Sequence, residues 1–511
     1  MTMEYSSSSF LFRLALTSLL FLLSLLLITL LSGRTTNHRL PPSPRALPVV
    51  GHLHLIRAPV HRAFHRLTSR YGPLIHLRLG STPCVIAASP DVAREFLKSN
   101  DATFSNRPLS VATRVFAYDA AGFAFAPYGP YWRFVKRLCV SDLLAPRTVD
   151  FLRPVRRAEL HALVYAVLTK AKLREAVDLT WELIRMSNDE IVKMTTGTTV
   201  AMAEEVRMMV KDVAELVGSF NLEDFVGLCK GWDLQGLGRR INEVHKRFDG
   251  FLERIIKVKE KKRRRKREGI EVVEEEVKVL LDILLDVAED ENAEFKLSRE
   301  NIKGFILDII TAGSDSTAAS IEWALAELIN RPEIRRKLQQ ELDQVVGKRR
   351  LVDETDLPNL PYLQAVFKET MRLHPPAPIL QRQSTKHIEV NGYDIPQGTI
   401  LFVNIWSIGR DPNYWEDPLE FRPERFLDSD VDMKGLHFQC IPFGSGRRGC
   451  PGMGLALQAG PTTVGVLMQC FEWEVGGDGK VDMEDGVGLI NAKVKPLVIV
   501  PVPRLDPFPD I

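Results

Sequence analysis

The stretch Phe443-Gly444-Ser445-Gly446-Arg447-Arg448-Gly449-Cys450-Pro451-Gly452 decides how the rest of the chain is interpreted. It places Cys450 in a loop whose glycines allow close backbone approach and whose two arginines supply positive charge. Cationic surroundings lower the pKa of a thiol and favour the thiolate, the form that binds metals. A cysteine thiolate is the proximal haem ligand of enzymes that favour O–O cleavage. The loop therefore predicts a haem-iron site, with a buried structural cysteine as the alternative.

The loop matches the pattern Phe-x-x-Gly-x-Arg-x-Cys-x-Gly, through which the chain resembles the cytochrome P450 superfamily. The matching positions are Phe443, Gly446, Arg448, Cys450 and Gly452. The resemblance runs from about Leu40 to the C-terminus. It implies a mainly α fold with small β-sheets, a haem b held through the Cys450 thiolate, and electrons from NADPH delivered by NADPH-cytochrome P450 reductase.

Composition agrees with a globular protein and excludes several other classes. Of 511 residues, 45% are hydrophobic and 26% are charged, and the formal net charge of +2 argues against a nucleic-acid binder. The cysteines are scattered without a CxxC pair, so neither a zinc site nor a disulfide framework is indicated. We expect all except Cys450 to be reduced core residues facing a cytosolic milieu.

The N-terminal segment differs in composition from the rest of the chain. Leu14–Leu31 is apolar apart from four hydroxyl residues and is just long enough to span a bilayer. Basic residues follow this run, while Glu4 is the only charged residue before Arg13, so the positive-inside rule places the C-terminal bulk in the cytosol. A cleaved signal peptide is the alternative, for which Ser32-Gly33 offers a weak site.

We therefore expect three parts, in a single-pass protein of the endoplasmic reticulum membrane. Residues 1–33 are the signal-anchor transmembrane segment, residues 34–50 are a stiff proline-rich hinge, and residues 51–511 are the catalytic domain. Hairpins are predicted at 75–87 and 388–395, and helices at 91–99, 131–144, 148–171, 179–195, 201–216, 237–262, 301–330 and 362–374. The basic run 257–267 predicts a solvated helix end, with contact to anionic lipid or an acidic electron donor as the alternative.

Two motifs gain meaning from the resemblance. Glu369 and Arg372 lie three apart on a predicted helix and can pair, although such a pair alone is commonly a surface feature. By the family pattern, Arg425 joins them in a buried structural triad.

In the predicted helix around Ala312-Gly313-Ser314-Asp315-Ser316-Thr317, Gly313 opens room or permits a kink. A mere kink is the alternative to a functional groove.

The family pattern makes that stretch an oxygen-activation groove, in which Asp315 relays protons and the neighbouring hydroxyls, Ser316 and Thr317, order water. Ser316 departs from the usual threonine: it keeps the hydroxyl but lacks the β-methyl that fixes the rotamer. Proton delivery is expected to survive, at altered coupling efficiency.

The resemblance also implies residues that bind the haem and the substrate. Candidates for the propionates are Trp132, Lys136, Arg107, Arg382 and Arg448, with Arg137 as a competitor of Lys136. Candidates for the substrate pocket are Ala312, Ser316, Ala377, Ile379, Leu380, Leu489, Ile490 and Asn491. The alternatives are solvated surface charges for the first group and plain core residues for the second.

Several stretches are similar to plant microsomal P450s that oxidise flavonoids. They are Trp323–Asn330, Ile408–Pro412, Gln469–Trp473 and Val500–Arg504. The group includes flavanone 2-hydroxylase, flavone synthase II, 2-hydroxyisoflavanone synthase and a pterocarpan hydroxylase. Its aryl-migrating members normally carry lysine at the position of Gln381, although Ser316 suits that branch.

We therefore expect oxidation of a flavanone at C-2, giving a 2-hydroxyflavanone or a flavone. The alternatives are 2-hydroxyisoflavanone synthase or a hydroxylase of another plant phenolic or terpenoid. More remote alternatives are an oxygen-independent thiolate-haem isomerase or dehydratase and a non-catalytic membrane haem protein.

Overall fold

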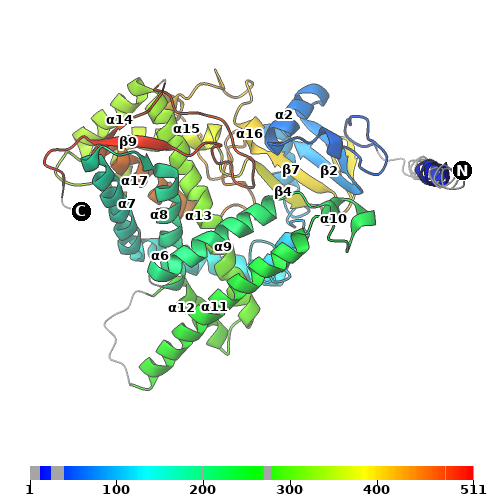
Figure 1. Ribbon diagram of the computed structural model, residues 1–511, viewed down its shortest axis with the longest axis horizontal. Helices are drawn as coiled ribbons and strands as arrows, with labels where there is room; N and C mark the ends of the chain where they lie inside the picture. Colours follow the sequence, from blue (N-terminus) through cyan, green and yellow to red (C-terminus); the bar gives the residue numbers. More distant parts are fainter. Residues whose placement is uncertain (1–11, 25–38, 198–199, 270–277, 478, 510–511) are drawn as a thin grey trace, which may run out of the picture.

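The computed structural model describes residues 12–24, 39–197, 200–269, 278–477 and 479–509. Helices form most of the body and three small β-sheets complete it (Figure 1), so the predicted mainly α architecture is confirmed. Residues 12–24 form a helix whose leucines are exposed. Within the described residues, no helix is both long and apolar enough to cross a membrane. Residues 25–31 of the expected span and 34–38 of the hinge lie outside the described residues.

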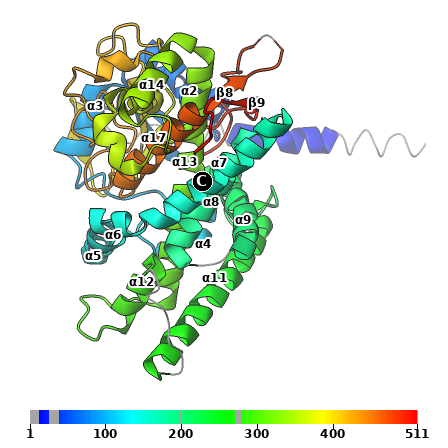
Figure 2. The same ribbon diagram turned by 90° about the vertical axis from the view of Figure 1, so that its left-hand side faces the viewer.

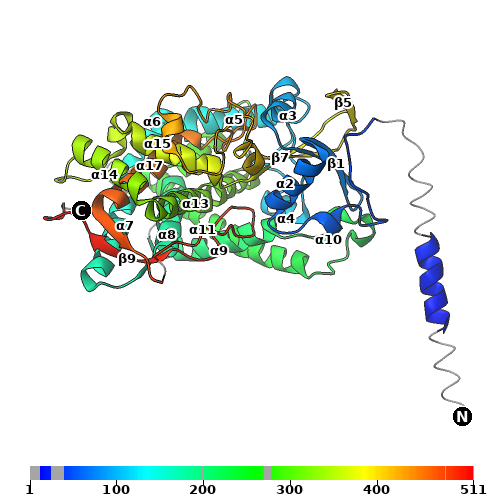
Figure 3. The same cartoon turned by 90° about the horizontal axis from the view of Figure 1, so that it is seen from above.

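The largest sheet joins distant parts of the chain. Its strand order is β1 (Leu74–Leu79), β2 (Thr82–Ala87), β7 (Ile400–Asn404) and β4 (Ile379–Gln383). The β1–β2 pair is the predicted hairpin, and β2 runs parallel to β7. Seen from above, the sheet lies at one end of the body beside α2 (Val60–Tyr71) (Figure 3). Because β4 follows the Pro375-Pro376 turn, this sheet fixes one predicted pocket segment.

The two other sheets are smaller. Strands β5 (Ile388–Val390) and β6 (Tyr393–Ile395) form the second predicted hairpin. Asn391 and Gly392 between them both have positive φ, 53° and 75°, as a type I′ turn requires. The third sheet has the order β3 (Val177–Asp178), β9 (Val498–Pro503) and β8 (Phe471–Glu474). Arg39 at the start of the described hinge residues bonds Asp394 at 2.8 Å, so the hinge runs against β6.

The predicted helical ranges correspond to helical parts of the structure, but several helices, such as those over 60–71, 280–289 and 332–345, were not predicted. The helices that follow α2 are α3 (Pro90–Arg94), α4 (Val111–Phe116), α5 (Pro130–Leu138), α6 (Pro146–Phe151), α7 (Arg153–Leu173), α8 (Leu179–Thr196), α9 (Val200–Gly218), α10 (Leu222–Phe225), α11 (Leu237–Arg267), α12 (Leu280–Glu289), α13 (Arg299–Asn330), α14 (Pro332–Val345), α15 (Pro361–Leu373), α16 (Ile405–Ile408) and α17 (Met453–Cys470). The single helix expected over 148–171 is wrong: the chain breaks at Leu152 into α6 and α7. Pro154 has no N–H to continue a helix and suits a helix start.

Helix α13 is the central element of the body and contacts α8, α15 and α17 (Figures 1 and 2). Most of its side chains are buried. A Cβ added at Gly313 would lie 2.9 Å from Ile191 on α8, so this glycine lets α8 approach closely. The helix is continuous across Gly313, and the room expected there is filled by Ile191.

Candidate active site

The loop before α17 has a backbone that folds around Cys450. The Cys450 amide donates to the Phe443 carbonyl at 2.9 Å, and the Gly449 amide donates to the Gly446 carbonyl at 3.0 Å. Gly446 has φ +71°, and an added Cβ would lie 2.6 Å from the carbonyl oxygen of Leu97. Only glycine fits there. Gly446 thus shapes the loop against its neighbours, and Phe443 packs on the hydrophobic core.

The sulfur of Cys450 lies at the N-terminus of α17 and accepts hydrogen bonds from the amides of Gly452 and Met453. The residue has exposed surface, yet burial is the main influence on its thiol. We infer that the exposed surface of Cys450 faces the interior of the protein rather than bulk water. Ala312 on the buried helix α13 is exposed in the same sense.

The expected lowering of the Cys450 pKa is wrong for the protein without a bound metal. Burial raises the pKa of this thiol, and the amides and the cations Lys136 and Arg107 oppose that rise without overcoming it. Desolvation disfavours the charged form more than these partners favour it. A metal ion coordinated by the thiol would supply the missing positive charge and deprotonate it.

Arg448 is buried and holds a loop that precedes α5. Its guanidinium donates to the carbonyls of Ser105 at 2.6 Å, Phe123 at 3.2 Å and Ala124 at 3.3 Å, and also to Ala126. It lies over the Trp132 ring, 4.4 Å from the centroid. Burial, followed by the nearby Arg107, lowers the pKa of Arg448 to about 9.

The other predicted propionate partners gather around Arg448. Arg382 donates to the Arg448 carbonyl at 3.3 Å, and Lys136 donates to the Gly449 carbonyl at 2.8 Å. Burial lowers the pKa of Arg107, Arg382 and Lys136. The Trp132 indole N–H donates to the Phe123 carbonyl at 3.2 Å. Arg137 instead pairs with Glu294 on the surface, which removes it as a competitor of Lys136.

This cluster has more cationic groups than acidic partners. The acids that act on its three arginines are Asp308 and Asp101, together with the Cys450 thiol. The Nε of Arg107 is buried with no hydrogen-bond partner in the described part of the chain. Buried cations need anionic partners, and arginine pairs well with carboxylates. The residues present therefore fit a haem whose two propionates meet these arginines while Cys450 binds its iron.

The residues of the predicted groove lie around Ala312 on α13. Ser316 Oγ donates back to the Ala312 carbonyl at 2.6 Å, a bond typical of serine inside helices. From α8, Ser187 donates to the Ser314 carbonyl at 2.8 Å. Burial raises the pKa of Asp315, against the opposing charge of Lys211. Asp315, Ser316 and Thr317 are each partly exposed, so all three reach water or the cavity.

The Glu369–Arg372–Arg425 group is assembled beneath the loop. Arg372 forms two bonds of 2.7 Å to the Glu369 carboxylate, and both side chains have no exposed surface. Arg425 joins the same carboxylate at 3.0 Å. The remaining Arg372 donors reach carbonyls of residues 409, 418 and 420. This buried pair with satisfied donors ties α15 to the segment that leads to the Cys450 loop.

The predicted pocket residues come from three separate segments. Ala312 lies on α13, and Ala377, Ile379 and Leu380 follow α15 and enter β4. Leu380 reaches the Cys450 loop, because a Cβ at Gly444 would lie 3.3 Å from its side chain. Leu489 is 46% exposed and Ile490 is partly exposed, on a loop near the C-terminus, whereas Asn491 is buried.

Sequence reasoning missed the loop that Arg448 holds and the acid behind it. Asp308 on α13 accepts from the Ala124 amide at 2.9 Å, and burial raises the pKa of Asp308 to about 7. A Cβ at Gly122 would clash with the Asp308 carboxylate at 2.2 Å. The signal available was the glycine pair Gly122 and Gly304, whose backbones lie in contact. No motif includes these two glycines, so the sequence alone could not link them to this site.

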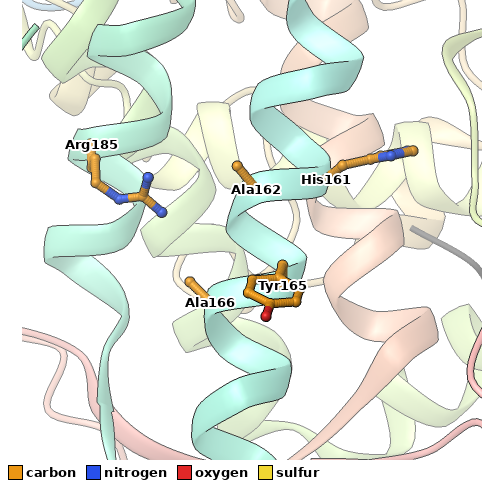
Figure 4. Close-up of a pocket in the computed structure, with 5 residues that line it drawn as sticks. All are labelled: His161, Ala162, Tyr165, Ala166 and Arg185. Atoms are coloured by element: carbon orange, nitrogen blue, oxygen red, sulfur yellow. The ribbon is translucent and has the colours of Figure 1, made fainter. Parts of the chain in front are cut away.

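A separate surface hollow of about 520 Å³ lies on α7 and α8. Its lining residues are His161, Ala162, Tyr165, Ala166 and Arg185 (Figure 4). None of them belongs to the Cys450 region. The hollow is therefore not the candidate active site.

Comparison with known proteins gives the family. The family described as Cytochrome P450 matches residues 41–500. "Cytochrome P450 93G1" of Oryza sativa subsp. japonica is 57% identical over 93% of this chain and 92% of its own length. "3,9-dihydroxypterocarpan 6A-monooxygenase" of Glycine max is 49% identical over 94% and 96%, and "2-hydroxyisoflavanone synthase" of Glycyrrhiza uralensis is 42% identical over 92% and 93%. A zebra fish cytochrome P450 structure with progesterone aligns with TM-score 0.74 at 24% identity, covering 88% of this chain and all of that one.

The chain belongs to the cytochrome P450 family. It is a monooxygenase that uses haem b bound through a cysteine thiolate, with electrons supplied by a reductase. Cys450 is the residue at the family's ligand position.

Proposed function

We propose that this monooxygenase oxidises a flavanone at C-2, giving a 2-hydroxyflavanone or, by net desaturation, a flavone. The observation that carries the proposal is the similarity, over more than nine-tenths of the chain, to relatives named for pterocarpan and 2-hydroxyisoflavanone chemistry. Gln381 favours simple C-2 oxidation over aryl migration. It lies on β4 with an exposed side chain, directly after Leu380.

The chain's own residues have distinct parts in this reaction. The haem supplies the oxidising chemistry when it is bound. Cys450 would hold the iron, and Arg107, Arg382 and Arg448 would hold the propionates. Ala312 would leave room for substrate, because its methyl is the smallest side chain that a helix favours.

In this proposal, residues of the α13 groove supply the protons. Asp315 is partly exposed and so placed to exchange protons with solvent, and burial raises the pKa of its carboxyl. Ser316 bonds the Ala312 carbonyl in the resting protein and can rotate to hold a water molecule or donate its own proton into the cavity. Apolar Leu380, Leu489 and Ile490 suit a flat aromatic substrate.

One alternative substrate assignment has an observation in its favour. Ser316 suits the aryl-migrating branch, so a 2-hydroxyisoflavanone synthase is the second candidate. The N-terminal run Leu14–Leu31 supports a further proposal, that the chain is a single-pass protein of the endoplasmic reticulum with its catalytic domain in the cytosol.

Yeast microsomes that carry the chain and a plant reductase test the proposal. They are incubated with naringenin, with and without NADPH, and products are resolved by mass and chromatography against authentic flavone and isoflavone standards. The proposal predicts an NADPH-dependent product that is heavier by one oxygen or lighter by two hydrogens. An isoflavone skeleton would favour the second candidate, and no product beside a normal thiolate-type carbon monoxide spectrum would discard flavanones.

A further inference from the structure

Two segments of the predicted pocket are bonded directly to each other. One is the turn of residues 375–380 after α15, and the other is the loop of residues 485–493, which carries Leu489 and Ile490. The Asn491 amide donates to the Pro376 carbonyl at 2.8 Å. The loop is closed at its base by the Gly486 amide, which donates to the Ala492 carbonyl at 2.7 Å. A shift of one segment must therefore move the other.

Trp323 on α13 touches both segments. Its indole N–H donates to the Asn491 carbonyl at 2.7 Å, and the side chain is fully buried. Its ring stacks on His374, with centroids 4.1 Å apart and planes inclined by 5°. His374 directly precedes the Pro375-Pro376 turn. One side chain thus contacts the base of the loop and the start of the turn.

The partners of Trp323 are themselves fixed. His374 Nε2 lies 2.6 Å from the carboxylate of Glu327, one helical turn beyond Trp323 on α13. The Lys493 ammonium lies 5.0 Å from the centre of the Trp323 ring. At the other end of the loop base, Asp485 bonds Arg62 of α2 at 2.9 Å. Ring stacking and buried charge-assisted bonds hold these groups in one arrangement.

The tip of the loop meets a second wall. A Cβ added at Gly218, the last residue of α9, would lie 3.0 Å from the Leu489 amide nitrogen and 3.4 Å from its Cβ. The glycine therefore permits close contact between α9 and the tip. Leu489 remains 46% exposed in spite of this contact. With the base held at Trp323 and the tip at Gly218, Leu489 and Ile490 have little freedom.

We propose that Trp323, supported by His374 and Glu327, is a positioning residue that sets where Leu489 and Ile490 lie in the substrate pocket, and so which substrate carbon is presented for oxidation. The inference rests on the proposed function in taking these two residues as substrate contacts. Oxidation requires the reacting atoms to be about 3–3.5 Å apart, and a misplacement of about 1 Å is costly. A wall bonded to α13 provides that accuracy.

The test substitutes Trp323→Phe. This change keeps a ring against His374 but removes the indole N–H that donates to the Asn491 carbonyl. Trp473→Phe is the matched control, because Trp473 is a buried tryptophan of β8 that contacts Phe471. Naringenin product and hydrogen peroxide are measured per NADPH consumed. We expect Trp323→Phe to release about fivefold more peroxide per product, the effect of losing one buried hydrogen bond. Both proteins should keep the parent carbon monoxide spectrum.

A second readout separates this inference from the substrate proposal. Phenylimidazole binds haem iron directly, and its spectral Kd needs no flavanone turnover. We expect this Kd to weaken about fivefold in Trp323→Phe and to stay unchanged in Trp473→Phe. A changed Kd without naringenin turnover rejects the flavanone and keeps the positioning role. Unchanged Kd and peroxide yield, with a normal carbon monoxide spectrum, overturns the positioning role. If Trp323→Phe binds no haem, Glu327→Gln decides by the same two readouts.

Discussion

The Cys450 loop and the proposed substrate wall of residues 375–380 and 485–493 are built in different ways. The turn of the loop is closed by bonds within ten residues, such as Cys450 to Phe443, although Arg448 also bonds distant carbonyls such as that of Ser105. The wall is held by Trp323, His374 and Asn491, which come from three distant parts of the chain. The contrast teaches that the turn around Cys450 is encoded by a local motif, whereas the proposed substrate wall depends on contacts between distant parts of the chain.

The largest effect is expected at the loop. Cys450→Ser replaces the thiolate by a hydroxyl, so the haem iron loses its thiolate ligand. We expect complete loss of the thiolate-type band in the reduced carbon monoxide spectrum and loss of turnover. Cys440→Ser, at a buried cysteine that has no bond to the haem loop, is the control and should keep the band. A thiolate-type band in Cys450→Ser would overturn the ligand assignment.

The next effect concerns the support beneath the loop. Arg372→Lys removes a two-bond contact with Glu369 where both side chains are fully buried. Breaking such a pair costs about 3 kcal/mol or more. We expect a lower unfolding midpoint in denaturant and poor haem retention. Arg422→Lys, whose side chain pairs with exposed Glu416, should behave like the parent, and equal losses in both variants would contradict a special role for Arg372.

A smaller effect is expected in the α13 groove. Asp315→Asn removes the titrating group and should slow turnover about 100-fold, the lower end of what a positioned acid or base contributes. The spectral Kd for substrate should be unchanged, because the wall is untouched. Asp142→Asn on the surface provides the control. A weakened Kd with unchanged turnover at saturation would place Asp315 in binding rather than proton supply.

Ser316→Thr adds the β-methyl that fixes the hydroxyl rotamer. We expect about a twofold gain in product formed per NADPH consumed, with the product identity kept, because the wall decides which carbon reacts. The ratio is read from NADPH oxidation and product formation in the same sample. A switch of product would show that the groove, not the wall, selects the carbon.

The last prediction concerns a residue outside both regions. Burial raises the pKa of Glu190 on α8 from 4.5 to about 8. The folded state holds this proton until about pH 8, whereas the unfolded state releases it near 4.5, so the stability linked to it is complete below pH 4.5 and is lost as pH rises to about 8. Glu190→Gln should therefore flatten the decline of unfolding free energy across this range. Exposed Glu175→Gln should leave the decline intact, and an unchanged slope in Glu190→Gln would contradict the buried proton.

The same contrast explains what could be predicted from sequence. Helix ranges, both hairpins and the Cys450 loop followed from periodicity and short motifs, because local chemistry defines them. The break at Leu152 was missed because an apolar helical pattern continues across Pro154. The rise in the Cys450 pKa could not be foreseen, because burial depends on the whole fold. Trp323 entered the sequence analysis only as part of the stretch Trp323–Asn330, since nothing in its neighbours along the chain points to Asn491, far away in sequence.

The central claim, that this is a flavanone-oxidising monooxygenase, is tested most directly by oxygen labelling. Microsomes with the chain and a reductase are given naringenin and NADPH under ¹⁸O₂, and the product is analysed by mass spectrometry with fragmentation. The account predicts one ¹⁸O atom at C-2 where the product is hydroxylated, and an unlabelled product lighter by two hydrogens where the outcome is a flavone. A label elsewhere, oxygen drawn from water, or product formed without NADPH would contradict it.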